Sequence, residues 1–193
     1  MSEGERRRRV LDAGLATFVR FGLRRTTMAD IAQAAGMSRP SLYQLFDSKD
    51  AIFAAVLRDM GDRALAAIAA ALPTQRDERD RLRLVIELWC VAGYALASTS
   101  PEATELVDAS NDAGHEVMNA IYSQVETIIA DILEPAAGAD STRAASVLMA
   151  TARGFKHKRP SVENYREQMF KTIDIILAAY GSSAERRTAE EQK

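Results

Sequence analysis

Cysteine is nearly absent from this chain, because Cys90 is the only one among 193 residues. A disulfide framework is therefore excluded, and a single thiol suits a reducing compartment. Proline and glycine are also scarce, with five and ten residues, whereas alanine is abundant. This composition favours helices over strands. No apolar stretch approaches the length of a transmembrane helix, so we expect an all-α protein in the cytoplasm with no membrane partner.

The sequence signatures of enzymes are missing as well. There is no phosphate-binding glycine loop, no nucleophile elbow and no HExxH pair. Two histidines and one cysteine, far apart in the sequence, make no convincing metal site, although carboxylate ligands stay open as an alternative. The apolar residues that follow the N-terminal arginines are interrupted by Asp12 and Arg20, unlike those of a signal peptide. We therefore expect neither catalysis nor a bound metal or cofactor.

Charge is distributed unevenly along the chain. The formal net charge is −2, but residues 1–50 contain nine Lys and Arg against six Asp and Glu, which leaves +3 there and −5 in the remainder. A basic head on an acidic body fits a protein that approaches phosphate with one end. The alternative is that the four arginines at 6–9 form an ordinary solvated tail.

Residues 27–46 predict two short helices joined by a tight turn. Thr27 is a good N-cap for the first helix, and Gly36 ends it in a conformation that favours glycine. Ser38 caps the second helix, and Pro40 falls in its first turn, where a missing N–H costs little. This layout is typical of a helix-turn-helix, which presents its second helix to the major groove of DNA.

Helices on both sides support this pair. Apolar residues at helical spacing predict a first helix over residues 5–21, ended by Gly22. Ser48 caps a fourth helix, which can continue through an alanine-rich segment to Leu72, just before Pro73. A helix as short as the one after Ser38 would be marginal alone, so these neighbours must hold it.

Several residues agree in register with one family pattern. They are Gly22, Thr26, Thr27, Ile31, Ala32, Ala35, Gly36, Met37, Ser38, Tyr43, Phe46 and Lys49. This part of the chain resembles the DNA-binding domain of the tetracycline-repressor (TetR) family of bacterial regulators. The sequence departs from the family pattern at Pro40, where glycine is frequent, and at Leu45, where an aromatic residue or histidine is frequent.

The resemblance implies an all-α fold with two domains. Residues 1–50 would form a three-helix helix-turn-helix domain that binds DNA. Residues 51–181 would form a helical ligand-binding and dimerisation domain, reached by a long connecting helix over about residues 48–72. Residues 182–193 would be a polar tail, which we expect to be disordered.

The predicted DNA contacts fall into two groups. Helix N-termini at Thr27 and Ser38 offer backbone N–H groups to phosphate, and Tyr43 and Lys49 are expected to contact phosphate too. Arginine prefers guanine and glutamine prefers adenine, so Arg39, Ser41 and Gln44 of the second helix are assigned to base edges. A plain N-cap for Ser38 and a packing role for Tyr43 stay open. The predicted DNA-binding set is Thr26, Thr27, Ser38, Arg39, Pro40, Ser41, Tyr43, Gln44 and Lys49.

Only helices are predicted beyond Pro73. A polar break over 74–81 precedes a central, buried helix over 82–97, and a short acidic helix follows Pro101. Three further helices are predicted over 112–133, ended by Pro135, over 141–158, stopped by Pro160, and over 161–180, closed by Gly181.

The last two helices carry more apolar surface than one core needs, so two chains could form a four-helix interface. The predicted interface residues are Leu148, Met149, Ala152, Phe155, Tyr165, Met169, Ile173, Ile176 and Tyr180. The resemblance implies the same homodimer, and a two-fold dimer would read a pseudo-palindromic operator in double-stranded DNA. The alternative is that both apolar stripes are buried inside one chain.

The resemblance also implies a small hydrophobic ligand that releases DNA, with the fourth helix as the lever. Trp89, Tyr94, Met118 and Tyr122 lie on the helices that line the ligand site in this family, and His115 could supply a polar anchor. Core or surface roles are the alternative for all five. The predicted function is a transcriptional repressor released from its operator by the ligand. The alternative is a ligand-independent regulator with a filled C-terminal core.

Overall fold

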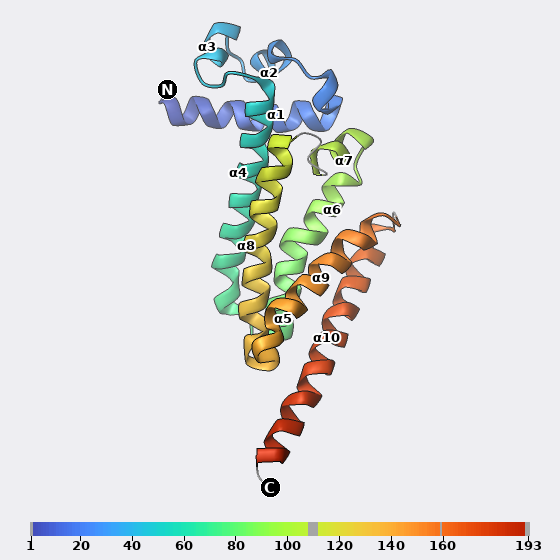
Figure 1. Ribbon diagram of the computed structural model, residues 1–193. Coiled ribbons are helices and arrows are strands. Elements are labelled where there is room, and N and C mark those ends of the chain that lie inside the picture. Colours follow the sequence, from blue (N-terminus) through green and yellow to red (C-terminus); the bar gives the residue numbers. More distant parts are fainter. Residues whose placement is uncertain (1, 108–111, 159, 192–193) are drawn as a thin grey trace. The chain divides into compact units, whose positions relative to one another are not determined.

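The computed structural model describes residues 2–107, 112–158 and 160–191, and all secondary structure in these ranges is helical (Figure 1). The all-α prediction is confirmed. The α-helices are α1 (Glu3–Arg25), α2 (Met28–Ala34), α3 (Arg39–Tyr43), α4 (Lys49–Ala71), α5 (Glu78–Val85), α6 (Ala92–Ala97), α7 (Pro101–Val107), α8 (Asp112–Ala137), α9 (Ser141–Lys156) and α10 (Val162–Glu191). Short 3-10 turns follow α4 and α8, and a π-helical segment, Ile86–Val91, joins α5 to α6. No described helix is both long and apolar enough to cross a membrane.

The chain folds into two compact units that interleave in sequence. The headpiece unit comprises Met1–Ala64 and Ala95–Ile121, and the C-terminal unit comprises Leu65–Tyr94 and Tyr122–Lys193. Helices α4, α6 and α8 each begin in one unit and end in the other. The predicted division after residue 50 follows a different line, because α7 shares a compact unit with α1.

In the headpiece unit, α1 crosses the first turns of α4, and both α2 and α7 pack against α1 (Figure 1). Phe18 of α1 and Phe53 of α4 are fully buried, and their rings meet edge to face with centroids 5.3 Å apart. Gly14 allows this close crossing, since a Cβ there would lie 3.0 Å from the side chain of Ile52. On the other side, Ala103 and Leu106 of α7 are buried.

Gly22 interrupts α1 as predicted, although one more helical turn follows it. Its φ of 75° and ψ of 161° lie outside the helical region, and glycine adopts them at little cost. The carbonyls exposed by this break find nearby donors. Thr26 Oγ1 donates to Gly22 O at 2.7 Å, and Ser100 Oγ donates to Val19 O at 3.2 Å. Arg25 donates to Phe21 O and pairs with Glu102 of α7, so α7 stabilises the end of α1.

The core of the C-terminal unit lies between α5, the π-helical segment, α9 and α10. Tyr165 of α10 is fully buried there, with Tyr94 stacked on it at 4.5 Å between centroids. The π-helical segment is held from α10, because Arg166 donates to both carboxylate oxygens of Glu87 at 2.9 Å. Burial of apolar side chains and this bidentate ion pair therefore stabilise the same segment.

Three predicted helix ends are wrong. Helix α5 begins at Glu78, inside the predicted polar break, because Asp77 caps it by accepting from the N–H of Asp80 at 2.8 Å. Pro135 lies inside α8, and Gly138, with φ of 53°, follows the true end of that helix. Helix α10 continues through Gly181 to Glu191, so the predicted tail is helical in its described part.

Candidate nucleic-acid interface

The N-terminus of α2 is closed by the capping pair Thr27 and Asp30. The Thr27 hydroxyl accepts from the N–H of Asp30 at 3.3 Å, and the Asp30 carboxylate accepts from the N–H and hydroxyl of Thr27 at 2.8 and 2.7 Å. The Thr27 hydroxyl and then the Thr27 N–H hold the pKa of Asp30 below its usual value. The N–H and the hydroxyl of Thr27 are thus both bonded to a carboxylate of the same helix, which also suits the positive end of the helix dipole.

Helix α3 begins as the sequence predicts, with Ser38 as its N-cap. Ser38 Oγ accepts from the N–H of Ser41 at 3.2 Å, and the two hydroxyls lie 2.8 Å apart. Leu42 is fully buried and Phe46 is 5% exposed, so these two side chains anchor the helix to the headpiece. The helix-turn-helix layout predicted from residues 27–46 is therefore present.

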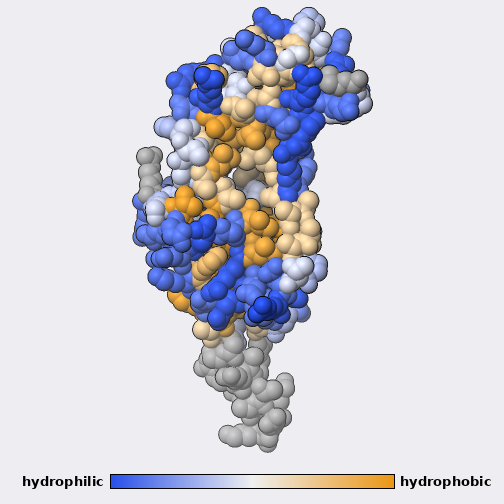
Figure 2. Space-filling model, turned by 180° about the vertical axis from the view of Figure 1, so that it is seen from behind, coloured by the Kyte–Doolittle hydropathy of each residue, from blue (hydrophilic) through white to orange (hydrophobic). Residues whose placement is uncertain are grey.

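The outward side of α3 carries most of the predicted base readers. Arg39, Pro40, Tyr43 and Gln44 are exposed, and Ser41 is half-buried beside Ser38. Tyr43 keeps 47% of its surface, so the structure gives it no place in the core. Hydrophilic residues make up most of the uppermost surface in Figure 2, the end that Figure 1 shows to contain α2 and α3.

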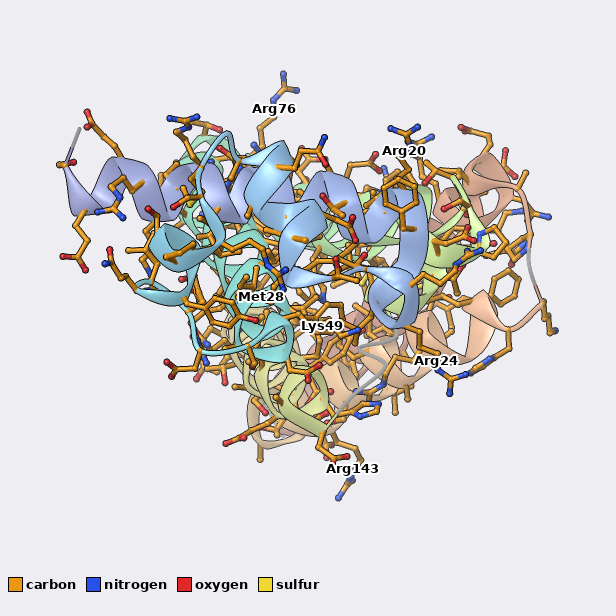
Figure 3. All side chains as sticks on the ribbon, turned by 90° about the horizontal axis from the view of Figure 1, so that it is seen from above. Arg20, Arg24, Met28, Lys49, Arg76 and Arg143 are labelled. Carbon is orange, nitrogen blue, oxygen red and sulfur yellow. The ribbon has the colours of Figure 1, made fainter. Side chains whose placement is uncertain are left out.

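Two members of the predicted DNA-binding set face inward. Thr26 is 1% exposed, and its hydroxyl is committed to Gly22 O. Lys49 Nζ donates to the carbonyls of Leu23, Thr26 and Arg24 at 2.8, 3.0 and 3.2 Å. Figure 3 shows Lys49 within the headpiece, whereas Arg20 and Arg24 reach outward. An ammonium has three donors, so the structure uses Lys49 to close the end of α1.

The arginines at 6–9 are not a plain solvated tail. Arg8 pairs with Asp12 at 3.2 Å and with Asp59 of α4 at 3.0 Å, and Arg63 of α4 pairs with the same two carboxylates. This four-residue network joins α1 to α4 on the headpiece surface. The two pairs that link the helices join residues 51 positions apart, so no local sequence pattern predicts them.

The predicted ligand residues are divided between the two units. In the C-terminal unit, Trp89 and Tyr122 meet edge to face at 5.7 Å, and the Arg153 guanidinium covers the Tyr122 ring at 5.4 Å. Tyr94 is buried, and its hydroxyl donates to Pro160 O at 2.7 Å. In the headpiece unit, His115 is exposed and Met118 is buried. The described contacts thus bring together two of the predicted ligand residues, Trp89 and Tyr122, with Arg153, which the sequence did not predict.

Most of the predicted dimer-interface residues are buried within the single chain. This is what the alternative interpretation of the sequence expects, in which the same chain covers both apolar stripes. Each of Leu148, Met149, Ala152, Tyr165, Met169, Ile173 and Ile176 is at most 8% exposed, and Phe155 and Tyr180 are half-buried. The same helices expose other apolar side chains, with Val147 of α9 at 51% and Ile175 of α10 at 70%.

Comparison with known proteins agrees with the helix-turn-helix geometry. The family described as bacterial regulatory proteins, tetR family, matches residues 10–56. The transcriptional activator FasR of Mycolicibacterium smegmatis is 41% identical over 83 residues, which cover 43% of this chain and 38% of FasR. The transcriptional repressor KstR2 of Rhodococcus jostii is 32% identical over 126 residues, 65% of this chain and 53% of KstR2. The matches thus span about half or less of each relative's length.

Solved structures share the fold across the chain. A TetR-family transcriptional regulator from Streptomyces coelicolor has a TM-score of 0.72 at 20% identity, with 92% of this chain and 90% of that one covered. The regulator FadR of Bacillus subtilis, solved with stearoyl-CoA, has a TM-score of 0.68 at 15% identity, with 86% and 96% covered. The helix-turn-helix geometry and the family match fall on the same segment: residues 10–56 are similar to the bacterial regulatory proteins of the tetR family, and the solved structures share the fold.

Proposed function

We propose that the protein is a sequence-specific DNA-binding transcriptional regulator. The observation that carries the proposal is the exposed side of α3, where Arg39, Tyr43 and Gln44 project from a helix fixed by buried Leu42 and Phe46. A rigid helix with polar and aromatic side chains is what reading base edges in the major groove requires. We favour repression over activation, although FasR and KstR2 show that relatives of this chain do either.

The test is a selection of genomic DNA fragments by the purified full-length protein at a stated salt concentration. We expect enrichment of one pseudo-palindrome. Arg39→Ala should cost about 1–3 kcal/mol of operator binding and relax the preference at one base pair. Arg76→Ala removes the same charge from an exposed position in the C-terminal unit and is the matched control. Binding without any sequence preference by the wild-type protein would refute the proposed function.

The proposed partner chain is a second copy, seated on the exposed side of α9 and α10 instead of the buried stripe. Val147 and Ile175 are the large apolar side chains exposed there, and Ala150 and Gly154 of α9 are small and exposed. Small residues allow two helices to approach closely, and a closed two-fold dimer uses the same surface on both copies. Such a dimer would present two α3 helices to a pseudo-palindromic operator.

The proposed effector is a small hydrophobic ligand that binds at Trp89 and Tyr122. Two half-buried aromatic rings with Arg153 above one of them would suit an apolar body joined to an anionic group. FadR bound to stearoyl-CoA shows that this fold accepts a ligand of that kind. Trp89 is the only tryptophan of the chain, so its fluorescence reports on this position alone. Titration with stearoyl-CoA should change its emission and release DNA, whereas coenzyme A alone is the control.

A second candidate function, regulation without a ligand, is favoured by how firmly Tyr94 is held. Its ring stacks on Tyr165 and its hydroxyl is bonded to Pro160 O, so it contributes to a filled core. If neither stearoyl-CoA nor a broader set of acyl and aromatic carboxylates altered Trp89 emission or DNA release, this second function would replace the ligand-responsive one.

A further inference from the structure

Helix α3 is too short to hold its own position. It has five residues, Arg39–Tyr43, and isolated helices of that length are unstable in water. The last carbonyls of a helix also lack partners within it. Leu42 O accepts from the N–H groups of Leu45 and Phe46, whereas the Leu45 carbonyl, just beyond the helix, accepts from a side chain of another helix. The orientation of the base-reading side chains depends on what supplies that support.

Arg7 of α1 supplies it on the C-terminal side of α3. Its Nη1 donates to Leu45 O at 3.2 Å, and its guanidinium lies over the Phe46 ring, 4.2 Å from the centroid. Phe46 is one of the two buried anchors of α3. A planar guanidinium can donate at its edge while its face covers an aromatic ring, so Arg7 holds both the backbone and the anchor.

Arg9 supplies the corresponding support on the N-terminal side. Its Nη2 donates to Ala35 O at 2.7 Å, at the end of α2 and the start of the turn that leads to α3. The next residue, Gly36, has φ of 61°, and a Cβ there would lie 2.8 Å from Arg9 Nη2. Glycine is thus favoured at this position by its backbone conformation, and a side chain there would also have to displace the Arg9 guanidinium, the movable end of a flexible side chain.

We propose that Arg7 and Arg9 are positioning residues for DNA reading, and we call the pair the arginine brace. They fix α3 from both sides, so that Arg39 and Gln44 keep one orientation toward the bases. The inference rests on the proposed function, because it assigns a role in sequence recognition. It differs from the usual expectation for basic residues in a DNA-binding head, namely that their charge contacts phosphate.

Salt dependence separates the two roles. Each lost phosphate contact lowers the slope of log affinity against log salt by about 0.9, and it weakens all sequences alike. A lost positioning residue leaves that slope unchanged and lowers the preference for the operator over a scrambled duplex. The variants are Arg7→Gln and Arg9→Gln, and Arg76→Gln is the control for charge. Arg7→Lys keeps the charge but lacks the planar group that covers Phe46.

All variants are compared as full-length proteins at a temperature where circular dichroism shows them folded. We expect the ratio of operator to scrambled affinity to fall about tenfold in Arg7→Gln and Arg9→Gln with an unchanged salt slope. Arg7→Lys should show most of the same fall in the affinity ratio, and Arg76→Gln should have the wild-type ratio. Without DNA, amide hydrogen exchange across residues 37–46 should be about tenfold faster in the brace variants.

Two results would overturn the proposal that Arg7 and Arg9 are positioning residues. One is a reduced salt slope with equal weakening on both duplexes and rescue by Arg7→Lys, which would make the arginines phosphate contacts. The other is wild-type exchange across residues 37–46 together with a wild-type affinity ratio. If the wild-type protein shows no preferred sequence, the proposed function fails and sequence positioning fails with it. The exchange data then still show whether the arginines hold α3.

Discussion

Replacing Lys49 with methionine tests whether this lysine holds the headpiece together or binds DNA. Lys49→Met keeps most of the aliphatic stem and removes the ammonium, which donates to the carbonyls of Leu23, Arg24 and Thr26 at 2.8 to 3.2 Å. The bonds to Leu23 and Thr26 are partly buried, whereas the bond to Arg24 is exposed. The variant therefore leaves two partly buried carbonyls of the α1 terminus without a charged donor.

The magnitude follows from those two bonds. A hydrogen bond to a charged group contributes about 1.5–3 kcal/mol, and water replaces part of it at a half-buried site, so the loss should be about 2–4 kcal/mol. For a chain of this size each kcal/mol lowers Tm by about 2–4 °C. The headpiece should therefore melt about 4–16 °C below the wild type.

Thermal unfolding of the full-length protein, followed by circular dichroism, measures this shift. Lys171→Met removes the same group from an exposed position of α10 and should leave Tm unchanged. DNA binding by folded Lys49→Met should keep the wild-type salt slope, because no phosphate contact is lost. A Tm equal to that of Lys171→Met, together with a slope reduced by about 0.9, would refute the reasoning and restore Lys49 as a phosphate contact.

Three further predictions concern other parts of the chain. Burial raises the pKa of the Cys90 thiol from 9.0 to about 12. The unfolded chain therefore ionises first, and the free energy of unfolding should fall as pH rises from about 9 to 12, by up to about 1.4 kcal/mol per pH unit. Urea titrations should show a weaker fall in Cys90→Ala. Gly61→Ala should cost about 1–3 kcal/mol in urea titrations, because its Cβ would overlap the Ile121 side chain, 2.8 Å from Cγ1. Gly93→Ala, where a Cβ meets nothing within 4 Å, should cost nothing. Ile175→Glu should yield a folded monomer by light scattering if the exposed side of α9 and α10 is the dimer interface, whereas a persistent dimer would move the interface elsewhere.

Local signals made the fold predictable from the sequence. The caps at Thr27 and Ser38, and the breaks at Gly22 and Gly36, depend on residues within three or four positions, and the structure contains all four. The prediction that Pro135 ends its helix was wrong. A proline in the last turn removes a single N–H donor there, so the helix continues past it. Helical glycine costs only about 1 kcal/mol relative to alanine, which is too little for Gly181 to stop α10.

The roles of the basic residues could not be predicted in the same way. Lys49 bonds to carbonyls 23 to 26 positions away, and Arg7 to one 38 positions away. No sequence period links such pairs, because only the packing of α1 on its neighbours brings them together. What covers the apolar stripe on α9 and α10 could not be predicted for a related reason. Apolar periodicity identifies the buried side of a helix but does not say whether the same chain or a second copy covers it.

The π-helical segment Ile86–Val91 is equivalent to an α-helix with one residue inserted. Each residue of an α-helix turns the chain by about 100°, but the wider π turn absorbs the extra residue, so the residues after it keep the direction they would have without it. Deleting a single residue between Ile86 and Val91 would therefore restore a regular helix with Tyr94 still facing Tyr165, whereas holding all six residues in α-helical geometry would turn Tyr94 away by about 100°. A relative without the extra residue would therefore need a one-position gap here in a sequence alignment, and the residues that follow the gap would keep their side of the helix.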